Sequence, residues 1–327
     1  MSLKSKLIIM LNENQEKFLS GEAIADELGV SRTAIWKIIN NLKEDGYEIE
    51  TVKKKGYRLL ENNDLLNSDM ILNSLTNKDS FRIECVDRIS STNIALKQRI
   101  NEDEGLVIVA NHQENGIGRM NRQFFSPKDT GVYFSILLKP QFESSKTIFI
   151  TTMAAVAVCN AIKSVTGIEA SIKWVNDIYI NGKKIAGILT QGSFSIENNK
   201  AEYIILGIGL NIYMPEGGFP SDIENRAASL LSIKSGGIRN KLVAEIINEF
   251  WKIYLKPNYE EVARKYKELS FVIGQEVQVI SVNEDRVAKV LDIDENCNLI
   301  VEFNDGDIQK LSSGEIQIKI SNVIANI

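Results

Sequence analysis

Apolar residues recur at helical spacing in three short runs within the first sixty positions. Ser20 and Ser31 are suitable N-caps for the second and third runs, and Gly29 separates them. Two strands are expected after the third run, at residues 47–52 and 57–60. The pattern therefore predicts three helices and a hairpin, with apolar faces that include Leu3, Leu7, Met10 and Leu11 in the first helix and Ile35, Ile38, Ile39 and Leu42 in the third.

This order of helix, glycine turn, helix and hairpin predicts a winged helix-turn-helix domain over residues 1–62. The outward face of the third helix carries hydrogen-bond donors, and three consecutive lysines occupy the hairpin tip. Such groups suit phosphates and base edges. The alternative is a three-helix packing module whose charges are only solvated. We favour DNA binding and expect contacts from Arg32, Thr33, Trp36, Lys37, Lys53, Lys54 and Lys55.

Longer apolar runs after the polar residues 61–64 predict a mixed sheet with helices, of class α+β, over residues 63–269. From Phe271 onward helical signals end, and short strands alternate with Asn, Asp and Gly turns, which predicts a small β-barrel over residues 270–327. The expected strands are 81–88, 106–110, 131–138, 203–207, 287–293, 299–303 and 316–320, and the expected helices of the central part are 95–100, 147–165 and 241–254.

Three polar segments interrupt the apolar pattern of the central part. Residues 90–93, Ser-Ser-Thr-Asn, are either a helix N-cap or donors and acceptors for a small ligand. Residues 112–127 form a long loop with two glycines and two arginines, either a plain surface loop or an anion-binding loop. Residues 173–189 predict a strand, a bend and a hairpin that turns at Asn181-Gly182, with more polar side chains than a buried hairpin requires.

Composition restricts the possible functions. The net charge of −5 argues against a general nucleic-acid coat, so any DNA contact must come from a local cluster. The single histidine, His112, argues against a histidine-based triad or metal site. The three cysteines lack metal-ligand spacing and indicate reduced thiols in a cytoplasmic protein. No membrane partner is expected, because no apolar run is expected to be long enough to cross a bilayer and residues 1–19 lack an export signal.

Four motifs occur in chain order and together resemble those of the biotin protein ligases. With a winged helix in front and a small barrel behind, the whole chain resembles the bifunctional form, biotin–[acetyl-CoA-carboxylase] ligase and biotin operon repressor. Each motif is weak alone, and the set is specific. The motifs are Ser91-Thr92-Asn93; Gln113 with Gly116-x-Gly118-Arg119; Lys173-Trp174-x-Asn176-Asp177 with Lys184-x-x-Gly187-Ile188-Leu189; and Gly207-x-Gly209-x-Asn211.

The resemblance implies a fold related to class II aminoacyl-tRNA synthetases, and it implies a reaction. Biotin and ATP give biotinyl-5′-AMP and pyrophosphate, and the biotinyl group then passes to a lysine of a biotin carboxyl carrier protein. Mg²⁺ would screen the triphosphate. The family also implies that the adenylate-filled site favours a homodimer, which binds two-fold operator DNA.

The same resemblance assigns roles to residues of this chain. Lys184 and Arg119 would be catalytic, on the biotin carboxylate and the phosphate. Biotin would be bound by Ser91, Thr92, Asn93, Gln113, Gly116, Ile117, Gly118, Arg119, Lys184 and Gly187, and the nucleotide by Arg119, Arg122, Phe124, Trp174, Asn176 and Asn211, with no protein metal ligand assigned.

The chain departs from the family pattern at four positions within these motifs. Ile117 replaces the usual first arginine of the loop, Asn121 a glycine, Phe124 a tryptophan and Val175 a proline. The glycines of the first barrel turn are also missing around residues 291–298. Asparagine tolerates a positive φ, so the change at 121 is mild. We expect these departures to alter adenylate affinity and not the identity of the reaction.

Three other functions fit parts of the pattern. The first is a biotin-sensing transcription factor whose ligase domain has lost catalysis, although Lys184 and Arg119 both survive. The second is a lipoate–protein ligase, which usually carries a histidine-containing, glycine-rich segment after paired arginines and lacks a winged helix. The third is a helix-turn-helix regulator of another small molecule.

Overall fold

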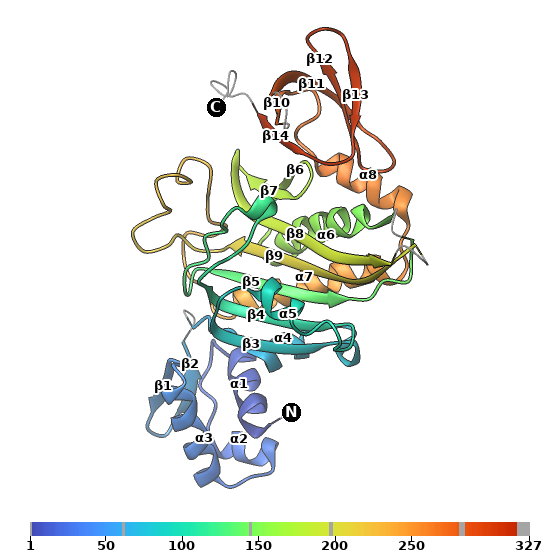
Figure 1. Ribbon diagram of the computed structural model, residues 1–327. Coiled ribbons are helices and arrows are strands. Elements are labelled where there is room, and N and C mark those ends of the chain that lie inside the picture. The colour runs from blue at the N-terminus through green and yellow to red at the C-terminus, as the bar shows by residue number, and fades with distance from the viewer. Residues whose placement is uncertain (1, 61–62, 144–145, 196–198, 281–284, 319–327) are drawn as a thin grey trace.

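The computed structural model describes residues 2–60, 63–143, 146–195, 199–280 and 285–318. It consists of a helical N-terminal part, a central sheet backed by helices, and a small C-terminal sheet, arranged in that order along the molecule (Figure 1). This confirms the predicted α+β class and its three parts.

The N-terminal part is a winged helix-turn-helix, as predicted. Ser20 and Ser31 cap their helices by accepting hydrogen bonds from the backbone N–H groups of Ala23 and Ala34, and Gly29 ends the second helix with a φ of 66°. The apolar faces meet in a separate core cluster. The elements are α1 (Leu3–Glu13), α2 (Gly21–Leu28), α3 (Arg32–Glu44), β1 (Ile49–Val52) and β2 (Gly56–Leu59).

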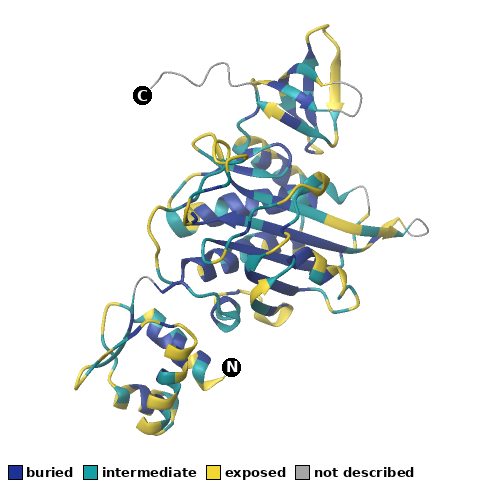
Figure 2. Ribbon diagram, turned by 60° about the vertical axis from the view of Figure 1, so that its left-hand side comes forward, coloured by how far each residue is buried: buried dark blue, intermediate teal, exposed yellow. Residues whose placement is uncertain are grey.

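The central sheet has seven strands in the order β3-β4-β5-β9-β8-β7-β6. The β3–β4 pair is parallel and the other pairs are antiparallel. Figure 2 shows the sheet as the most continuous buried layer of the molecule. Its strands are β3 (Arg82–Ile89), β4 (Leu106–Gln113), β5 (Gly131–Leu138), β6 (Ser171–Lys173), β7 (Asp177–Ile180), β8 (Lys183–Ser195) and β9 (Lys200–Asn211).

Helices cover both faces of this sheet unequally. The long helices α6 and α7 pack together on one face, and the short α5 lies on the other (Figure 1). The helix α8, which sequence patterns did not reveal, packs on α6 and β6. The helical segments are α4 (Ser68–Asn73), η1 (Lys78–Ser80), α5 (Thr92–Lys97), η2 (Arg119–Asn121), α6 (Ile148–Thr166), α7 (Ile238–Leu255) and α8 (Tyr259–Leu269).

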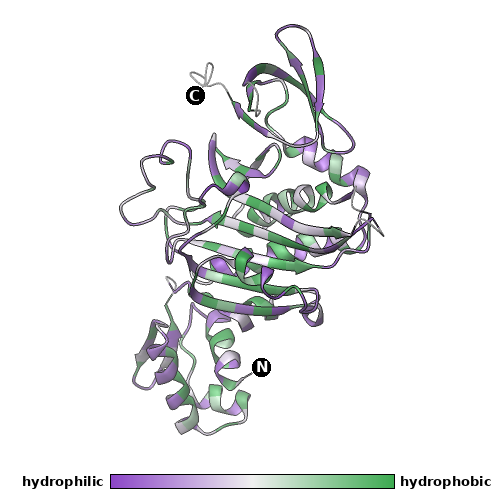
Figure 3. Cartoon of the chain, viewed as in Figure 1, coloured by the Kyte–Doolittle hydropathy of each residue, from purple (hydrophilic) through white to green (hydrophobic). Residues whose placement is uncertain are grey.

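The helix α6 is apolar enough to resemble a membrane span. By length and composition alone it would cross a bilayer, so the expectation that no apolar run is long enough was wrong for this segment. However, 67% of its apolar window is buried inside the protein. Its small-residue face, including Ala154, Ala157 and Ala161, is fully buried, as expected for close packing in a core. The helix packs on β6, β7 and β8, and Figure 3 shows hydrophobic colour concentrated in the middle of the molecule, where the sheet and its helices lie.

The C-terminal part is an antiparallel sheet of five strands in the order β13-β12-β11-β10-β14. Because β13 and β14 do not pair with each other in the described residues, the sheet is open, and the predicted closed barrel was wrong in this detail. Residues 319–320 of the predicted last strand lie outside the described residues. The strands are β10 (Glu276–Ile280), β11 (Arg286–Ile293), β12 (Leu299–Phe303), β13 (Ile308–Leu311) and β14 (Glu315–Ile318).

The two predicted domain boundaries differ in character. Near the first, residues 61–62 lie outside the described residues, and the winged-helix core cluster extends past the boundary to Met70 in α4 without joining the central cluster. Across the second, at residue 269, one core cluster continues from the central sheet into β10, β11 and β12. The C-terminal sheet is therefore built onto the central part through shared apolar packing, and both boundaries remain predictions.

Candidate functional site

A buried polar network lies where three neighbouring strands of the central sheet meet α5. Thr92, at the first position of α5, donates from its backbone N–H to Gln113 Oε1 at 2.9 Å, and its hydroxyl lies 3.1 Å from the same atom. That hydroxyl also shares a hydrogen bond of 2.7 Å with Ser135 in β5. Ser91 and Thr92 are both almost fully buried. The sheet thus brings together the predicted biotin residues of two distant segments.

Asn93 extends this network across the sheet. Its amide oxygen accepts a hydrogen bond of 2.6 Å from Ser135, and its amide nitrogen donates to Gln191 Oε1 at 2.9 Å. A Cβ atom at Gly207 would lie only 2.1 Å from the Asn93 oxygen, so glycine is required there. Sequence reasoning missed Ser135 and Gln191. The available signal was a lone serine inside the otherwise apolar or aromatic strand at residues 131–138.

The loop after β4 folds as a small hairpin closed by its own backbone. The N–H of Gly118 donates to Arg122 O and that of Phe124 donates to Gly116 O, both at 2.7 Å. The turn places Met120 and Asn121 at φ values of 54° and 56°. The positive φ expected of Asn121 is therefore confirmed.

Glycines on the facing strands make room for the Phe124 ring. A Cβ atom at Gly209 would lie 2.5 Å from that ring, and one at Gly187 would lie 3.3 Å from both the ring and the Lys184 Nζ. A Cβ atom at Gly116 would collide with the Phe124 carbonyl oxygen at 2.3 Å. Three motif glycines therefore share one physical role, which is to let Phe124 and its loop lie against the sheet.

The two predicted catalytic cations bind adjacent residues of one bend, Asn176 and Asp177. The Arg119 guanidinium donates to Asn176 Oδ1 at 3.0 Å and to the Gly314 carbonyl oxygen at 2.9 Å. The Lys184 ammonium donates to Asp177 Oδ1 at 2.6 Å. Since Asn176 and Asp177 are neighbours in the chain, the structure brings Arg119 and Lys184 to one place.

Other charged groups surround this bend. Arg122 pairs with Glu315 at 2.6 Å, and this ion pair ties the loop to the C-terminal sheet. Lys173 is partly buried, and this burial lowers the pKa of its ammonium, while Asp177 acts in the opposite direction. A site rich in fixed cations suits substrates that carry phosphate and carboxylate groups. Among the described residues, no group of three or more His, Cys, Asp or Glu is placed to hold a metal ion.

Two predicted nucleotide residues have structural partners. Trp174 is 3% exposed, and its indole N–H donates to the Cys297 carbonyl oxygen at 2.9 Å, so its ring fills the core between the central and C-terminal sheets. Asn211 is buried at the end of β9, and its amide nitrogen lies 3.4 Å from the Ala228 carbonyl oxygen. Their roles toward a nucleotide remain predictions.

The segment 213–235, which we call the β9–α7 loop, was not predicted to belong to the site. Its middle pairs with the backbone of Lys184, because Lys184 N–H donates to Arg226 O at 2.7 Å and Ala228 N–H donates to Lys184 O at 2.8 Å. It is the long loop drawn in yellow-brown at the left of Figure 1. The position of the Lys184 backbone therefore depends on this loop.

The predicted DNA-binding residues lie on the surface of the winged helix. Arg32, Thr33 and Lys37 are exposed on α3, and Trp36 there is 56% exposed although it is a large apolar residue. The three lysines at positions 53–55 form the exposed turn between β1 and β2. The structure thus gathers the predicted residues on one helix and one wing.

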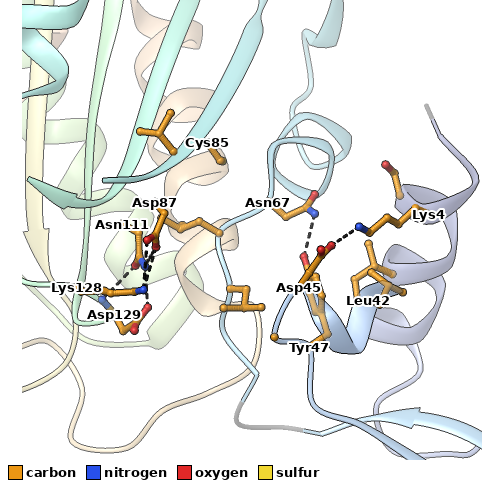
Figure 4. A pocket seen from close by; sticks show the side chains of 16 residues that line it. Lys4, Leu42, Asp45, Tyr47, Asn67, Cys85, Asp87, Asn111, Lys128 and Asp129 are labelled. Carbon is orange, nitrogen blue, oxygen red and sulfur yellow. Dashed lines mark hydrogen bonds and ion pairs between the residues drawn. The ribbon is translucent and has the colours of Figure 1, made fainter. Parts of the chain in front are cut away.

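A cleft of about 650 Å³ lies between the winged helix and the central part (Figure 4). Lys4, Asp45 and Tyr47 line one side of it, and Asp87 and Asn111 line the other. None of the predicted biotin or nucleotide residues lines this cleft. It marks the junction of two parts of the molecule and lies apart from the candidate site.

Comparison with known proteins identifies the family. The model of the biotin/lipoate A/B protein ligase family matches residues 85–211, a helix-turn-helix domain model matches residues 4–58, and the biotin protein ligase C-terminal domain model matches residues 272–319. The bifunctional ligase/repressor BirA of Bacillus subtilis is 34% identical over 97% of this chain and 99% of its own length. The chain belongs to the bifunctional biotin ligase/repressor family.

Further relatives agree with this family. The bifunctional ligase/repressor BirA of Escherichia coli is 29% identical over 96% of both chains. The solved biotin protein ligase of Aquifex aeolicus in complex with biotin and ATP is similar to this structure with a TM-score of 0.60 and 26% identity, over 73% of this chain and 98% of that chain. The expected family is thus confirmed, and the lipoate ligase alternative loses support.

Proposed function

We propose that this member of the bifunctional ligase/repressor family activates biotin with ATP and transfers it to a lysine of a biotin carboxyl carrier protein. The same chain represses transcription by binding operator DNA through its winged helix. The observation that supports the ligase most directly is the meeting of Arg119 and Lys184 on the Asn176–Asp177 bend, beside the buried Thr92–Gln113 network.

The chemistry suits a site without a histidine base. The biotin carboxylate is already ionised at neutral pH and attacks the α-phosphate, so no proton has to be removed from the nucleophile. Fixed positive charge is needed where two anions meet and where charge develops. We assign this task to Lys184 at the carboxylate and acyl-phosphate oxygens and to Arg119 at the phosphate.

The remaining assignments follow the position of each residue. Ser91, Thr92, Asn93 and Gln113 would bind the polar ureido end and the carboxylate region of biotin. The loop and glycine residues would offer backbone groups to biotin, and the small size of the glycines would let the ligand approach the chain closely. These residues are Gly116, Ile117, Gly118 and Gly187. Arg122, Phe124, Trp174, Asn176 and Asn211 would form the nucleotide side of the pocket. Here Trp174 would act from behind the pocket wall, because its ring is buried in the core.

Mg²⁺ fits the oxygen donors at the bend. Magnesium is usually bound by one or two carboxylates together with substrate phosphates. Asp177 supplies a carboxylate and Asn176 an amide oxygen close to Lys184 and Arg119. When bound with ATP, the ion would neutralise charge on the phosphates.

The repressor function extends this proposal to the oligomeric state of the protein and to its location in the cell. An adenylate-filled site would stabilise one arrangement of the loops and favour a homodimer, which would bring two winged helices to a two-fold operator. The protein would act in the cytoplasm, where both the carrier protein and DNA are found.

Two assays on the full-length protein test the proposal. Biotin-dependent exchange of labelled pyrophosphate into ATP should report the first step, and a streptavidin blot of a carrier domain after incubation with ATP and biotin should report the second. Absence of exchange would favour a sensor without catalysis. Competition by lipoate but not by biotin would favour the lipoate ligase.

A further inference from the structure

The linker between the winged helix and the central part, residues 63–67, is bonded to the start of α7. Gly237 N–H donates to Asn63 O at 3.2 Å, and the Asn240 amide nitrogen donates to Leu65 O at 2.7 Å. The side chain of Arg239 donates from Nε to the Asp64 carbonyl oxygen at 3.0 Å. The linker is therefore a fixed part of the fold over these residues.

Asp64 is the chemically unusual member of this linker. Its side chain is 4% exposed and receives the backbone N–H of Arg239 at 3.1 Å and the hydroxyl of Tyr213 at 2.7 Å. Burial raises the pKa of Asp64, and the Arg239 guanidinium opposes that rise. A carboxylate this buried requires its partners, because an unpaired buried charge is costly.

Tyr213 joins both ends of the β9–α7 loop at one oxygen atom. It is the first residue of that loop, and its hydroxyl accepts a hydrogen bond of 3.2 Å from the backbone N–H of Ser235, the last residue. The backbone of Tyr213 also pairs with Leu231. One phenol group thus closes the loop and fastens it to Asp64.

The β9–α7 loop in turn reaches the candidate site at two points. In its second half, Leu230 N–H donates to Asn211 O at 3.0 Å. In its middle, the backbone of residues 226–228 pairs with Lys184. The loop therefore holds the backbone of one predicted nucleotide residue and of the predicted catalytic lysine.

We propose that the Tyr213 hydroxyl and Asp64 are positioning residues of the ligase: their hydrogen bond holds the β9–α7 loop in the arrangement that binds ATP. Through this hydrogen bond, the interdomain linker would support the proposed nucleotide site from outside it. The proposal rests on the proposed function, since it concerns the ATP step. The biotin network at Thr92 and Gln113 makes no contact with this hydroxyl in the described residues.

The test compares Tyr213→Phe with Tyr254→Phe in the full-length protein. Tyr254 is the matched control, because its hydroxyl also donates to a carboxylate, Glu104, and its side chain is similarly buried, but it lies near the other end of α7. Steady-state pyrophosphate exchange gives KM for ATP and for biotin and gives kcat. For Tyr213→Phe we expect KM for ATP to rise about tenfold, as for loss of a hydrogen bond to a charged group. We expect kcat to fall as well, because the same loop pairs with the Lys184 backbone, and we expect KM for biotin to rise less than KM for ATP.

A double-variant comparison identifies the partner of the hydroxyl. If the hydroxyl acts through the Asp64 carboxylate, Asp64→Ala and Asp64→Ala/Tyr213→Phe should have the same KM for ATP, because neither variant offers the hydroxyl a side-chain acceptor at position 64. An equal further rise on adding Tyr213→Phe would overturn the proposal. So would an unchanged KM for ATP in Tyr213→Phe, an equal rise of KM for biotin, or the same change in Tyr254→Phe. Absence of exchange in the natural chain would instead overturn the proposed function and this proposal with it.

Discussion

The buried hydroxyl of Ser135 offers a sharp test of the proposal that the buried polar network around Thr92 and Asn93 binds biotin. Ser135 lies in β5 and is fully buried, and its hydroxyl lies 2.7 Å from the Thr92 hydroxyl and 2.6 Å from the Asn93 amide oxygen. Replacing Ser135 by alanine removes one oxygen atom and leaves the strand intact. Among the described residues, no other side chain donates a hydrogen bond to the Asn93 amide oxygen.

The cost of this change follows from the two hydrogen bonds of the Ser135 hydroxyl. A buried acceptor left without a partner costs about 1–3 kcal/mol, while the Thr92 hydroxyl keeps Gln113 as an acceptor. We therefore expect Ser135→Ala to lower the free energy of unfolding by about 2 kcal/mol. If half or more of that energy orients Thr92 and Asn93 toward biotin, the Kd for biotin should rise roughly fivefold to tenfold.

Thr151→Val is the matched control. The Thr151 hydroxyl forms a hydrogen bond of 2.8 Å with the Thr190 hydroxyl, between α6 and β8 on the opposite face of the sheet. Isothermal titration with biotin measures the Kd, and urea unfolding measures the stability of both variants. The control should lose stability and keep the Kd for biotin within about twofold. A stability loss in Ser135→Ala with an unchanged Kd would refute the reasoning, since the network would then be only structural.

Three further predictions address catalysis, DNA binding and pH. Lys184→Ala should abolish pyrophosphate exchange while circular dichroism shows the fold unchanged, and the neighbouring exposed Lys183→Ala should leave exchange near normal; a near-normal rate in Lys184→Ala would contradict its role. Replacing all three lysines 53–55 by alanine should weaken operator binding and reduce the slope of log K against log salt by up to about 3, whereas an unchanged slope would exclude the wing from the contact. Burial alone would raise the pKa of Asp294, but hydrogen bonds from Asn298 and Lys310 outweigh it and hold the pKa below its usual value. Because the folded pKa is the lower one, this stability is present above about pH 4 and is lost as pH falls through the folded pKa; Asp294→Asn should flatten that part of an acid unfolding curve, and an unchanged curve would contradict it.

Local signals predicted the winged helix well. Its helices begin at serine caps and end near glycines, and both signals act within a few residues of the boundary that they set. The start of α5 was predicted three residues too late, because Thr92 and Asn93 belong to the helix as well as to the buried network. Here one short segment serves two purposes, and sequence alone could not separate them.

Long-range contacts explain the parts that sequence could not reveal. The buried position of Trp174 depends on a turn 123 residues later in the chain, where the Cys297 carbonyl oxygen accepts a hydrogen bond from the Trp174 indole N–H. Ser135 and Gln191 join the network only because β5 and β8 both flank β9 and bring them to Asn93. The β9–α7 loop carries no motif, and its importance arises from backbone pairing with Lys184.

The structure also explains why the departure at Ile117 need not remove the proposed anion site. The family pattern has a cation there, but the site keeps four others, while two carboxylates lie among them. Asp177 pairs with Lys184 and Glu315 pairs with Arg122, so a bound phosphate would replace a carboxylate as the partner of each cation. The missing cation at 117 should therefore weaken retention of the adenylate without removing the excess of positive charge that favours it. The cations that remain are Arg119, Arg122, Lys173 and Lys184.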